Sequence, residues 1–237
     1  MKQYKTGILS LDAQLGGGIP GGTVVLILED PGAGGDVFTY HFAFEGLKNG
    51  EKVLYISTDD TENEIKESMR MYFDADDEIL SQLFILDLIS PRIGRFSIKT
   101  GTKDFLKKVS YDPLNNINAI LNHETFDRVV VNNLTYFFMN YQKEEIFKLF
   151  EGLSLNAKRN ESIFLLTITR GMFDPKLETA VKHVADGVIE LSLREVENEI
   201  QRRMKIIKFK KILVPKAILR YDLTEKGIRM ESVMRVL

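Results

Sequence analysis

Short apolar runs alternate along the chain with longer stretches in which apolar and polar positions follow a helical period. The runs are solidly apolar, which is typical of strands in a parallel sheet that is buried on both faces. We predict strands at residues 24–28, 52–57, 83–87, 128–132, 162–167 and 187–192. Helices are predicted between them at residues 37–49, 61–72, 113–122, 143–159 and 178–183. This alternation predicts an α/β fold, a mostly parallel sheet flanked by helices.

The carboxyl-terminal part of the chain follows a different pattern. Residues 203–214 and 219–224 alternate in part between apolar and polar side chains. This pattern predicts an antiparallel hairpin around Pro215 at the edge of the sheet. No internal repeat, low-complexity segment or linker interrupts the sequence, so we expect a single domain over residues 1–237.

Composition narrows the class of protein without naming a chemistry. Hydrophobic residues make up 44% of the 237 residues and charged residues 28%, as in ordinary soluble proteins. The net charge of −2 gives the whole chain no general attraction to nucleic acid or acidic membranes. The absence of cysteine excludes disulfides, thiol nucleophiles and cysteine-ligated metals, and with many Lys and Glu residues it suits a thermophile's intracellular protein.

No signal peptide or membrane span is visible in the sequence. The first residues lack the apolar core of a signal peptide, and no apolar run approaches the roughly 18 residues of a membrane span. We therefore expect a cytoplasmic protein that has no membrane partner.

A glycine-rich loop joins the first buried strand to the first helix. A phosphate-binding loop has glycine, four residues, glycine, lysine and then serine or threonine. Here Glu29 stands at the first glycine, Gly35 at the lysine and Asp36 at the hydroxyl residue. Losing the lysine and gaining Asp36 makes the loop more negative by two units of charge, which disfavours a bound polyphosphate. Each unit at about 4 Å corresponds to roughly 4 kcal/mol of interaction energy at an effective dielectric near 20. The predicted, degenerate nucleotide loop comprises Pro31, Gly32, Ala33, Gly34, Gly35 and Asp36.

Asp36 also has a structural interpretation. A carboxylate in the first turn of a helix complements the helix dipole and caps free N–H groups. It would then take the place that a phosphate occupies in an intact loop. We favour this self-capping role for Asp36.

Besides the loop, five segments of the chain resemble the KaiC-like ATPases of the RecA superfamily. The two segments that precede the loop, which include the run Leu15–Gly22, are the most specific. The segments are residues 6–12, 15–22, 46–57, 126–135 and 183–191, so that the resemblance spans nearly the whole chain. It implies a RecA-type core with nucleotide bound between neighbouring subunits of a ring or filament. Residues 90–108 carry no recognisable motif.

The resemblance implies a magnesium position and a general-base position. In the family an aspartate ends the strand at 128–132 and organises the magnesium shell, whereas Asn132 brings no charge. Family members place two glutamates where Asp59 and Asp60 stand, and one of them activates water. The shorter aspartates make this a vestigial catalytic position. Capping of the following helix by Asp59, Asp60 and Thr61 explains these residues equally well, and Thr61 and Glu64 have the spacing of a capping box.

Two lysines occupy the place of the family's trans-acting pair. Lys208 and Lys210 stand where KaiC-like proteins carry a lysine and an arginine that reach the neighbouring subunit's γ-phosphate. Spaced by two, they would share a strand face. Lysines that protect an edge strand from aggregation give the same pattern. Both interpretations remain open.

Two further interpretations involve charge. The acidic side chains near the loop could form a pocket for a cation; they are Glu29, Asp30, Asp36, Asp59 and Asp60. DNA binding is the other: residues 194–237 hold twelve basic and six acidic residues, and Arg170 and Lys176 follow the strand at 162–167. We favour neither, and we predict no metal site.

The expected function follows from the changes at Gly35, Asp36 and Asn132. We predict a non-catalytic or strongly impaired domain that acts as a regulatory or assembly module. It would form a homo-oligomer, or a hetero-oligomer with an active relative. The alternatives are a divergent ATPase and a DNA accessory protein resembling recombinase paralogues. No cofactor is certain, and we expect at most weak binding of ATP or ADP with magnesium.

Overall fold

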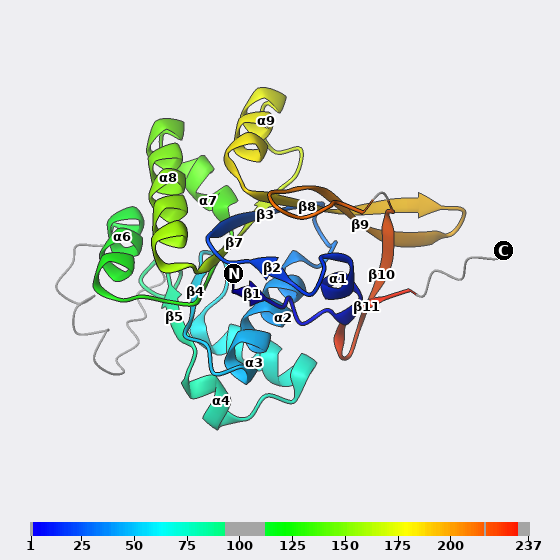
Figure 1. Cartoon of the computed structure of the whole chain (residues 1–237), viewed down its shortest axis with the longest axis horizontal. Coiled ribbons are helices and arrows are strands. Elements are labelled where there is room, and N and C mark those ends of the chain that lie inside the picture. Colours follow the sequence, from blue (N-terminus) through cyan, green and yellow to red (C-terminus); the bar gives the residue numbers. More distant parts are fainter. Residues whose placement is uncertain (1, 93–111, 216, 232–237) are drawn as a thin grey trace.

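The computed structural model describes residues 2–92, 112–215 and 217–231 (Figure 1). The strands are β1 Gln3–Tyr4, β2 Ile19–Pro20, β3 Thr23–Glu29, β4 Val53–Ser57, β5 Phe84–Asp87, β6 Arg128–Asn132, β7 Ile163–Thr169, β8 Gly187–Val196, β9 Glu199–Phe209, β10 Leu219–Thr224 and β11 Gly227–Met230. The helices are α1 Leu9–Gln14, α2 Gly35–Lys48, α3 Glu62–Phe73, α4 Asp77–Ser81, α6 Pro113–His123, α7 Leu134–Asn140, α8 Lys143–Asn160 and α9 Pro175–Val184.

A nine-stranded sheet runs through the molecule in the order β11-β10-β9-β8-β3-β7-β6-β4-β5. The six strands from β8 to β5 are parallel, as the solid apolar runs predict. Central β3 is buried along its whole length because side chains on both of its faces meet a layer of helices. The predicted RecA-like α/β fold is confirmed.

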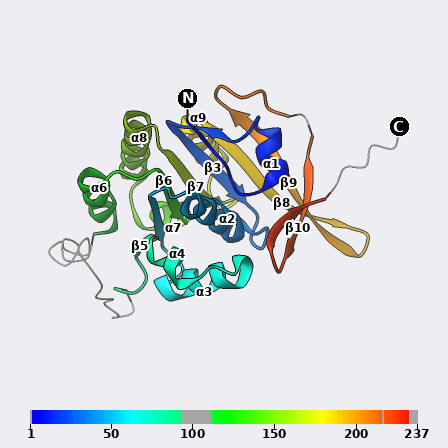
Figure 2. The same ribbon diagram turned by 60° about the horizontal axis from the view of Figure 1, so that its bottom comes forward.

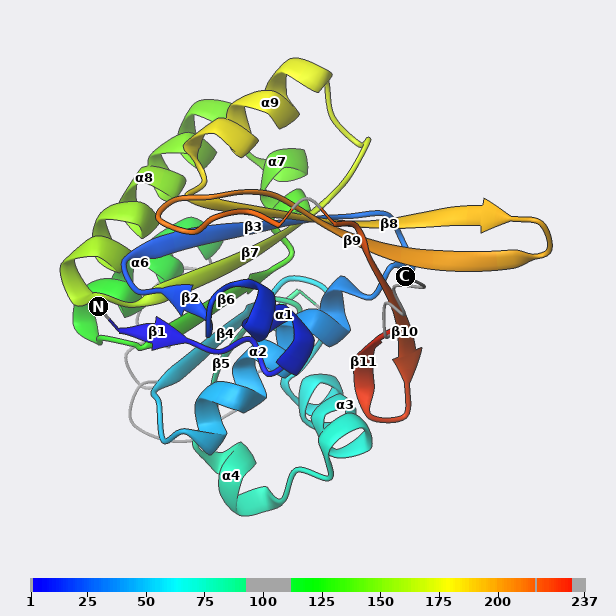
Figure 3. The same ribbon diagram turned by 45° about the vertical axis from the view of Figure 1, so that its right-hand side comes forward.

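Helices cover both faces of the parallel strands. The apolar side chains of α1, α2, α3 and α4 pack with Val25 and Ile27 of β3 on one face. Those of α6, α7, α8 and α9 pack with Val24, Leu26 and Leu28 on the other. Figures 2 and 3 show α2 and α3 on one side of the sheet and α8 on the other. Among the described residues, none of these helices combines the length and apolarity needed to cross a bilayer.

The carboxyl-terminal strands are antiparallel, as predicted, although their bounds differ from the prediction. β9 begins before residue 203 and ends at Phe209, and it pairs with both β8 and β10. β8 and β9 together form a long hairpin that projects beyond the rest of the sheet (Figures 1 and 3). β11 follows β10 as an edge strand that the sequence pattern did not predict. The motif-free stretch 90–108 lies largely outside the described residues.

A buried arginine anchors the amino-terminal segment to the sheet. The Arg128 guanidinium, on β6, has no solvent exposure. It pairs with Glu51 and donates to the carbonyl oxygens of Lys5 and Phe42 at 2.6 and 2.9 Å. One side chain therefore holds β6, α2 and the segment after β1 together, a contact that local sequence patterns do not reveal.

Candidate functional site

The glycine-rich loop lies at the carboxyl end of β3, and α2 begins directly after it at Gly35. Neighbouring parallel strands end at the same edge of the sheet: Ser57 of β4 is paired with Asn132 of β6. Asp59 and Asp60 follow β4, so they emerge beside the loop. The fold thus brings the loop, Asn132 and the two aspartates to one edge, as the sequence predicted.

Glu29, the last residue of β3, turns its side chain into the loop. The backbone N–H of Gly35 donates to Glu29 Oε2 over 2.7 Å. A Cβ atom on residue 35 would overlap the Glu29 carboxylate. The prediction that Asp36 caps the helix is therefore wrong in its residue, because the carboxylate on this first-turn N–H group belongs to Glu29.

Asp36 faces the end of β6. Asn132 donates its side-chain amide to Asp36 Oδ1 over 2.9 Å, and Thr167 donates its hydroxyl to Asn132 Oδ1 over 2.6 Å. The Asn132 side chain is therefore satisfied on both its oxygen and its nitrogen, as a buried amide requires. These are the two positions at which the family resemblance implies magnesium.

The two aspartates after β4 lie near Asp36 but play different structural roles. Asp60 accepts a hydrogen bond from the Tyr40 hydroxyl over 3.2 Å, and its backbone N–H donates to Ser57 Oγ. Thr61, rather than either aspartate, caps α3 in a capping box with Glu64. The predicted capping of α3 is therefore confirmed for Thr61, with its predicted partner Glu64, and is wrong for Asp59 and Asp60.

The carboxylates influence one another. Burial raises the pKa of Glu29 to about 7, and the charge of Asp36 adds to this rise. Burial is also the largest cause of the raised pKa values of Asp59 and Asp60, with Asp36 contributing to both. At this edge of the sheet, burial and the charge of Asp36 thus disfavour the ionised forms of the other three carboxyl groups.

Two arginines border these carboxylates, and both already have partners. Arg170, after β7, contacts Asp30 Oδ1 at 3.1 Å and Glu190 Oε1 at 3.0 Å. Arg92 donates to the Thr58 carbonyl over 3.2 Å and stacks on the Tyr136 ring. Because Arg170 is paired in this way, it does not present the free cation that the DNA interpretation assumed.

Strand β10 covers the loop from the side. The Tyr221 hydroxyl donates to the Ala33 carbonyl over 2.7 Å, and Tyr221 is fully buried. At Gly34, whose φ of +94° favours glycine, an added Cβ would lie 2.7 Å from Leu223 Cδ2. The loop is therefore fixed by a strand almost two hundred residues away in sequence.

Lys208 and Lys210 do not reach the loop of their own chain. Lys208 Nζ donates to the His183 carbonyl over 3.0 Å, and Lys210 Nζ contacts Asp186 Oδ1 at 2.5 Å. Both contacts lie at the start of β8, whereas the loop follows the opposite end of β3. A role toward a neighbouring subunit stays a prediction.

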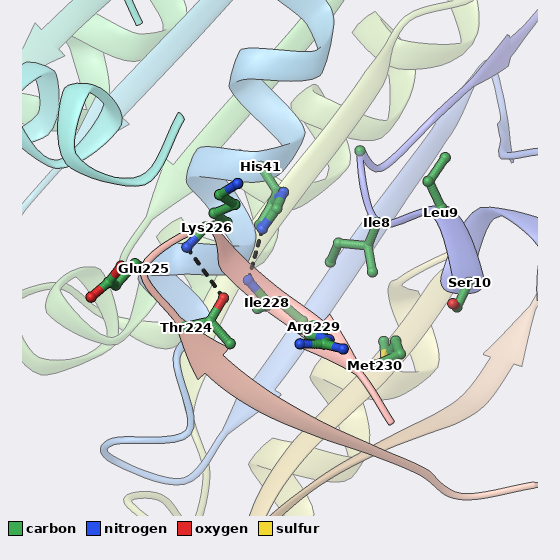
Figure 4. Close-up of a pocket in the computed structure, with 11 residues that line it drawn as sticks. Ile8, Leu9, Ser10, His41, Thr224, Glu225, Lys226, Ile228, Arg229 and Met230 are labelled. Atoms are coloured by element: carbon green, nitrogen blue, oxygen red, sulfur yellow. Dashed lines mark hydrogen bonds between the residues drawn. The ribbon is translucent and has the colours of Figure 1, made fainter. Parts of the chain in front are cut away.

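A separate hollow lies away from this edge. It measures about 770 Å³ and is formed by residues 7–10, His41 and the β10–β11 hairpin (Figure 4). Its floor includes a strand-to-helix contact, in which the Ile228 N–H donates to His41 Nε2 over 2.8 Å. Across residues 2–92, 112–215 and 217–231, no three His, Asp or Glu side chains form a metal-binding group. The cation-pocket interpretation therefore gains no support.

Sequence reasoning missed three residues that shape the loop: Glu29, Tyr221 and Leu223. Glu29 was considered as a missing glycine and as a member of an acidic pocket, and its carboxylate could have been weighed against Gly35 as a side-chain partner. Tyr221 was considered only as an aromatic residue that could stack on nucleic acid, and Leu223 carried only the alternation of an edge strand. No local signal links them to the loop.

Comparisons with known proteins agree with this architecture. The family model described as "ATPase: KaiC" matches residues 4–233. A UPF0273 protein of Thermotoga maritima is 26% identical over 238 residues, covering 96% of this chain and 95% of that protein. A UPF0273 protein of Pyrococcus horikoshii is 27% identical, covering 96% and 93%. The DNA repair protein RadA of Mycolicibacterium smegmatis is similar over 65 residues only, at 34% identity.

A solved structure extends the comparison to the fold. The crystal structure of a KaiC-like protein from the hyperthermophilic archaeon Pyrococcus horikoshii matches with a TM-score of 0.72. The match covers 98% of this chain and 99% of that one at 20% identity, which shows a shared fold. Since the family model spans all but the two ends of the sequence, the chain belongs to the KaiC family of ATPases in the RecA superfamily.

Proposed function

We propose that this KaiC-family domain does not turn over ATP and acts as an assembly or regulatory module, with copies of itself or with an active relative. The observation that carries the proposal is the gathering of Glu29, Asp36, Asp59 and Asp60 where the family binds a magnesium-bound triphosphate. Burial raises the pKa of Glu29, Asp59 and Asp60, the charge of Asp36 adds to each rise, and no lysine stands at position 35.

Charge argues against tight binding of a polyphosphate at this edge. Two like charges about 4 Å apart repel by roughly 4 kcal/mol at an effective dielectric near 20. Asp36 replaces a neutral hydroxyl, and Gly35 offers no compensating ammonium group. The neighbouring Arg170 is already shared between Asp30 and Glu190. A nucleotide would therefore meet repulsion, and the two arginines described beside this edge, Arg92 and Arg170, are already engaged.

The assembly part of the proposal draws on the preserved fold and on one protruding element. The family match extends over residues 4–233, so the scaffold is kept while the loop differs. The β8–β9 hairpin projects from the sheet and exposes two apolar side chains near its tip, Val196 and Ile200. Exposed apolar groups on a projecting arm suit contact with another subunit.

Phosphate release and calorimetry test the catalytic half. We expect no magnesium-dependent ATP hydrolysis above background, and no binding of ATP or ADP at millimolar concentration. The matched controls are D59N and D60N, which should leave any residual rate unchanged. Hydrolysis that either substitution abolishes would overturn the proposal and favour the divergent ATPase, with Lys208 or Lys210 acting from a neighbouring subunit.

Light scattering after size exclusion tests the assembly half. We expect an oligomer whose population falls in a V196S/I200S double variant. A monomer at every concentration, with or without an active KaiC-family protein from the same organism, would contradict this half. DNA binding is checked separately at low salt, where a genuine interaction would weaken steeply as salt rises.

A further inference from the structure

The glycine-rich loop already holds a carboxyl group from its own chain. Glu29 exposes only 9% of its surface, and its carboxylate lies between the end of β3 and the start of α2. Its Oε2 atom is 2.7 Å from the N–H nitrogen of Gly35, the first residue of α2. The Glu29 side chain therefore occupies the position that a bound ligand would take at this helix end.

The first turn of a helix is where such a ligand is stabilised. The N–H group of Gly35 has no acceptor within α2, because the first N–H groups of a helix point away from its hydrogen-bonded body. The helix dipole also places partial positive charge there. In an intact phosphate-binding loop these same features hold a phosphate. Here Glu29 supplies the accepting oxygen.

Glu29 and Gly35 form a matched pair. A Cβ atom on residue 35 would overlap the Glu29 carboxylate, so no side chain fits at 35 while Glu29 occupies the loop. Conversely, without a side chain at 35 the space is open to the glutamate. The missing lysine and the extra carboxylate are therefore one structural change at two positions.

We propose that the loop is a carboxylate-binding site whose ligand is Glu29 of the same chain, and that this internal ligand keeps phosphate groups out. The proposal deepens the proposed function and rests on it, because it gives the physical cause of the missing nucleotide binding. An external phosphate has to displace a group that is tethered six residues away, at a high effective concentration. Burial and the charge of Asp36 raise the pKa of Glu29, because both disfavour the ionised form of its side chain in the loop.

Amide hydrogen exchange at Gly35 tests the contact directly. Glu29 is the acceptor that the structure gives to this N–H group, so E29A should speed its exchange at least tenfold relative to the amides in the middle of α2. D36A is the matched control, because Asp36 bonds to Asn132 instead, and exchange at Gly35 should stay slow. Unchanged protection of Gly35 in folded E29A would overturn the proposal.

A pair of partly restored loops tests the exclusion of phosphate. The variants D36T and E29G/D36T both keep Gly35, so Glu29 can still occupy the loop in the first and is absent from the second. We expect E29G/D36T to bind ADP with magnesium at least tenfold more tightly than D36T. Equal affinities would show that Glu29 does not block the loop.

The outcomes separate this inference from the proposed function. ATP hydrolysis by the unaltered protein would remove the proposed function. Fast exchange at Gly35 in the unaltered protein, together with absent hydrolysis, would remove only the internal ligand. If a restored loop fails to fold, which circular dichroism shows, the exchange measurement on E29A still decides.

Discussion

Asn132 donates its side-chain amide to the Asp36 carboxylate over 2.9 Å. The contact joins the position where the phosphate-binding loop pattern has a hydroxyl residue to the position where the family resemblance implies an aspartate, and each of the two residues makes the other acceptable. An aspartate at 132 would have no N–H to donate and would face a second carboxylate. The change at one position therefore constrains the residue at the other.

Restoring the family's aspartate alone should destabilise the fold. N132D replaces a donor with a buried negative charge opposite Asp36, and it alters the contact with Thr167. Losing a charge-assisted hydrogen bond and burying a like charge should cost about 2 kcal/mol. Urea denaturation would measure this loss. The double variant D36N/N132D should recover most of it, and an unrecovered double variant would show that the two residues are not coupled.

The loop should loosen when its tie to β10 is removed. Y221F deletes the hydroxyl that bonds to the Ala33 carbonyl and leaves that buried oxygen unsatisfied, at a cost of about 1–3 kcal/mol. Amide exchange in residues 32–35 should also become faster. Y4F is the control, because the Tyr4 hydroxyl bonds to the Glu161 carbonyl. If both variants affect the loop equally, Tyr221 has no specific role there.

Glu29 should make stability fall as pH rises. Burial and the charge of Asp36 raise its pKa from 4.5 to about 7, so the folded chain keeps a proton that the unfolded chain has lost. The contribution is present below pH 4.5 and is lost as the pH rises through 7, amounting to about 3 kcal/mol. E29Q should remove this dependence, so its advantage over the unaltered protein grows between pH 4.5 and 8 in urea denaturation. A constant difference would contradict the assignment.

His41 should act in the opposite direction over nearly the same range. Burial, with the charge of Lys48, lowers its pKa from 6.5 to about 4, and Nε2 must stay unprotonated to accept from Ile228. The unfolded chain takes up the proton first, so stability is present above pH 6.5 and is lost as pH falls toward 4. H41Q should therefore gain stability relative to the unaltered protein as the pH falls. Parallel curves for the two proteins would exclude His41.

The sequence pattern predicted those parts of the molecule that depend on local periodicity. The apolar run at 24–28 appears as β3 at Thr23–Glu29, because a strand covered on both faces must be apolar throughout. β11 was missed because its four residues carry too short a pattern to separate from a turn. β1 and β2, with two residues each, are shorter still.

The site was predictable as an edge and unpredictable in its contacts. Adjacent parallel strands place Asp59 and Asn132 at one edge whatever their side chains do, and the family resemblance, rather than any local pattern, implied this. Whether a carboxylate bonds to a neighbouring amide or turns back into a loop depends on distances that sequence spacing does not encode. For this reason Glu29, and not Asp36, accepts from the first N–H group of α2, and of the residues expected to cap α3 only Thr61 does so.

The tie between Tyr221 and Ala33 has a consequence for how the chain acquires its structure. The loop is made well before its flanking strands β7 and β8 and before the covering strand β10. Contacts this distant in sequence close slowly, because the intervening chain must be ordered first. A nascent chain that ends before β10 would carry the glycine-rich loop without the strand that fixes it. The loop is thus completed only after the ribosome has added almost two hundred further residues.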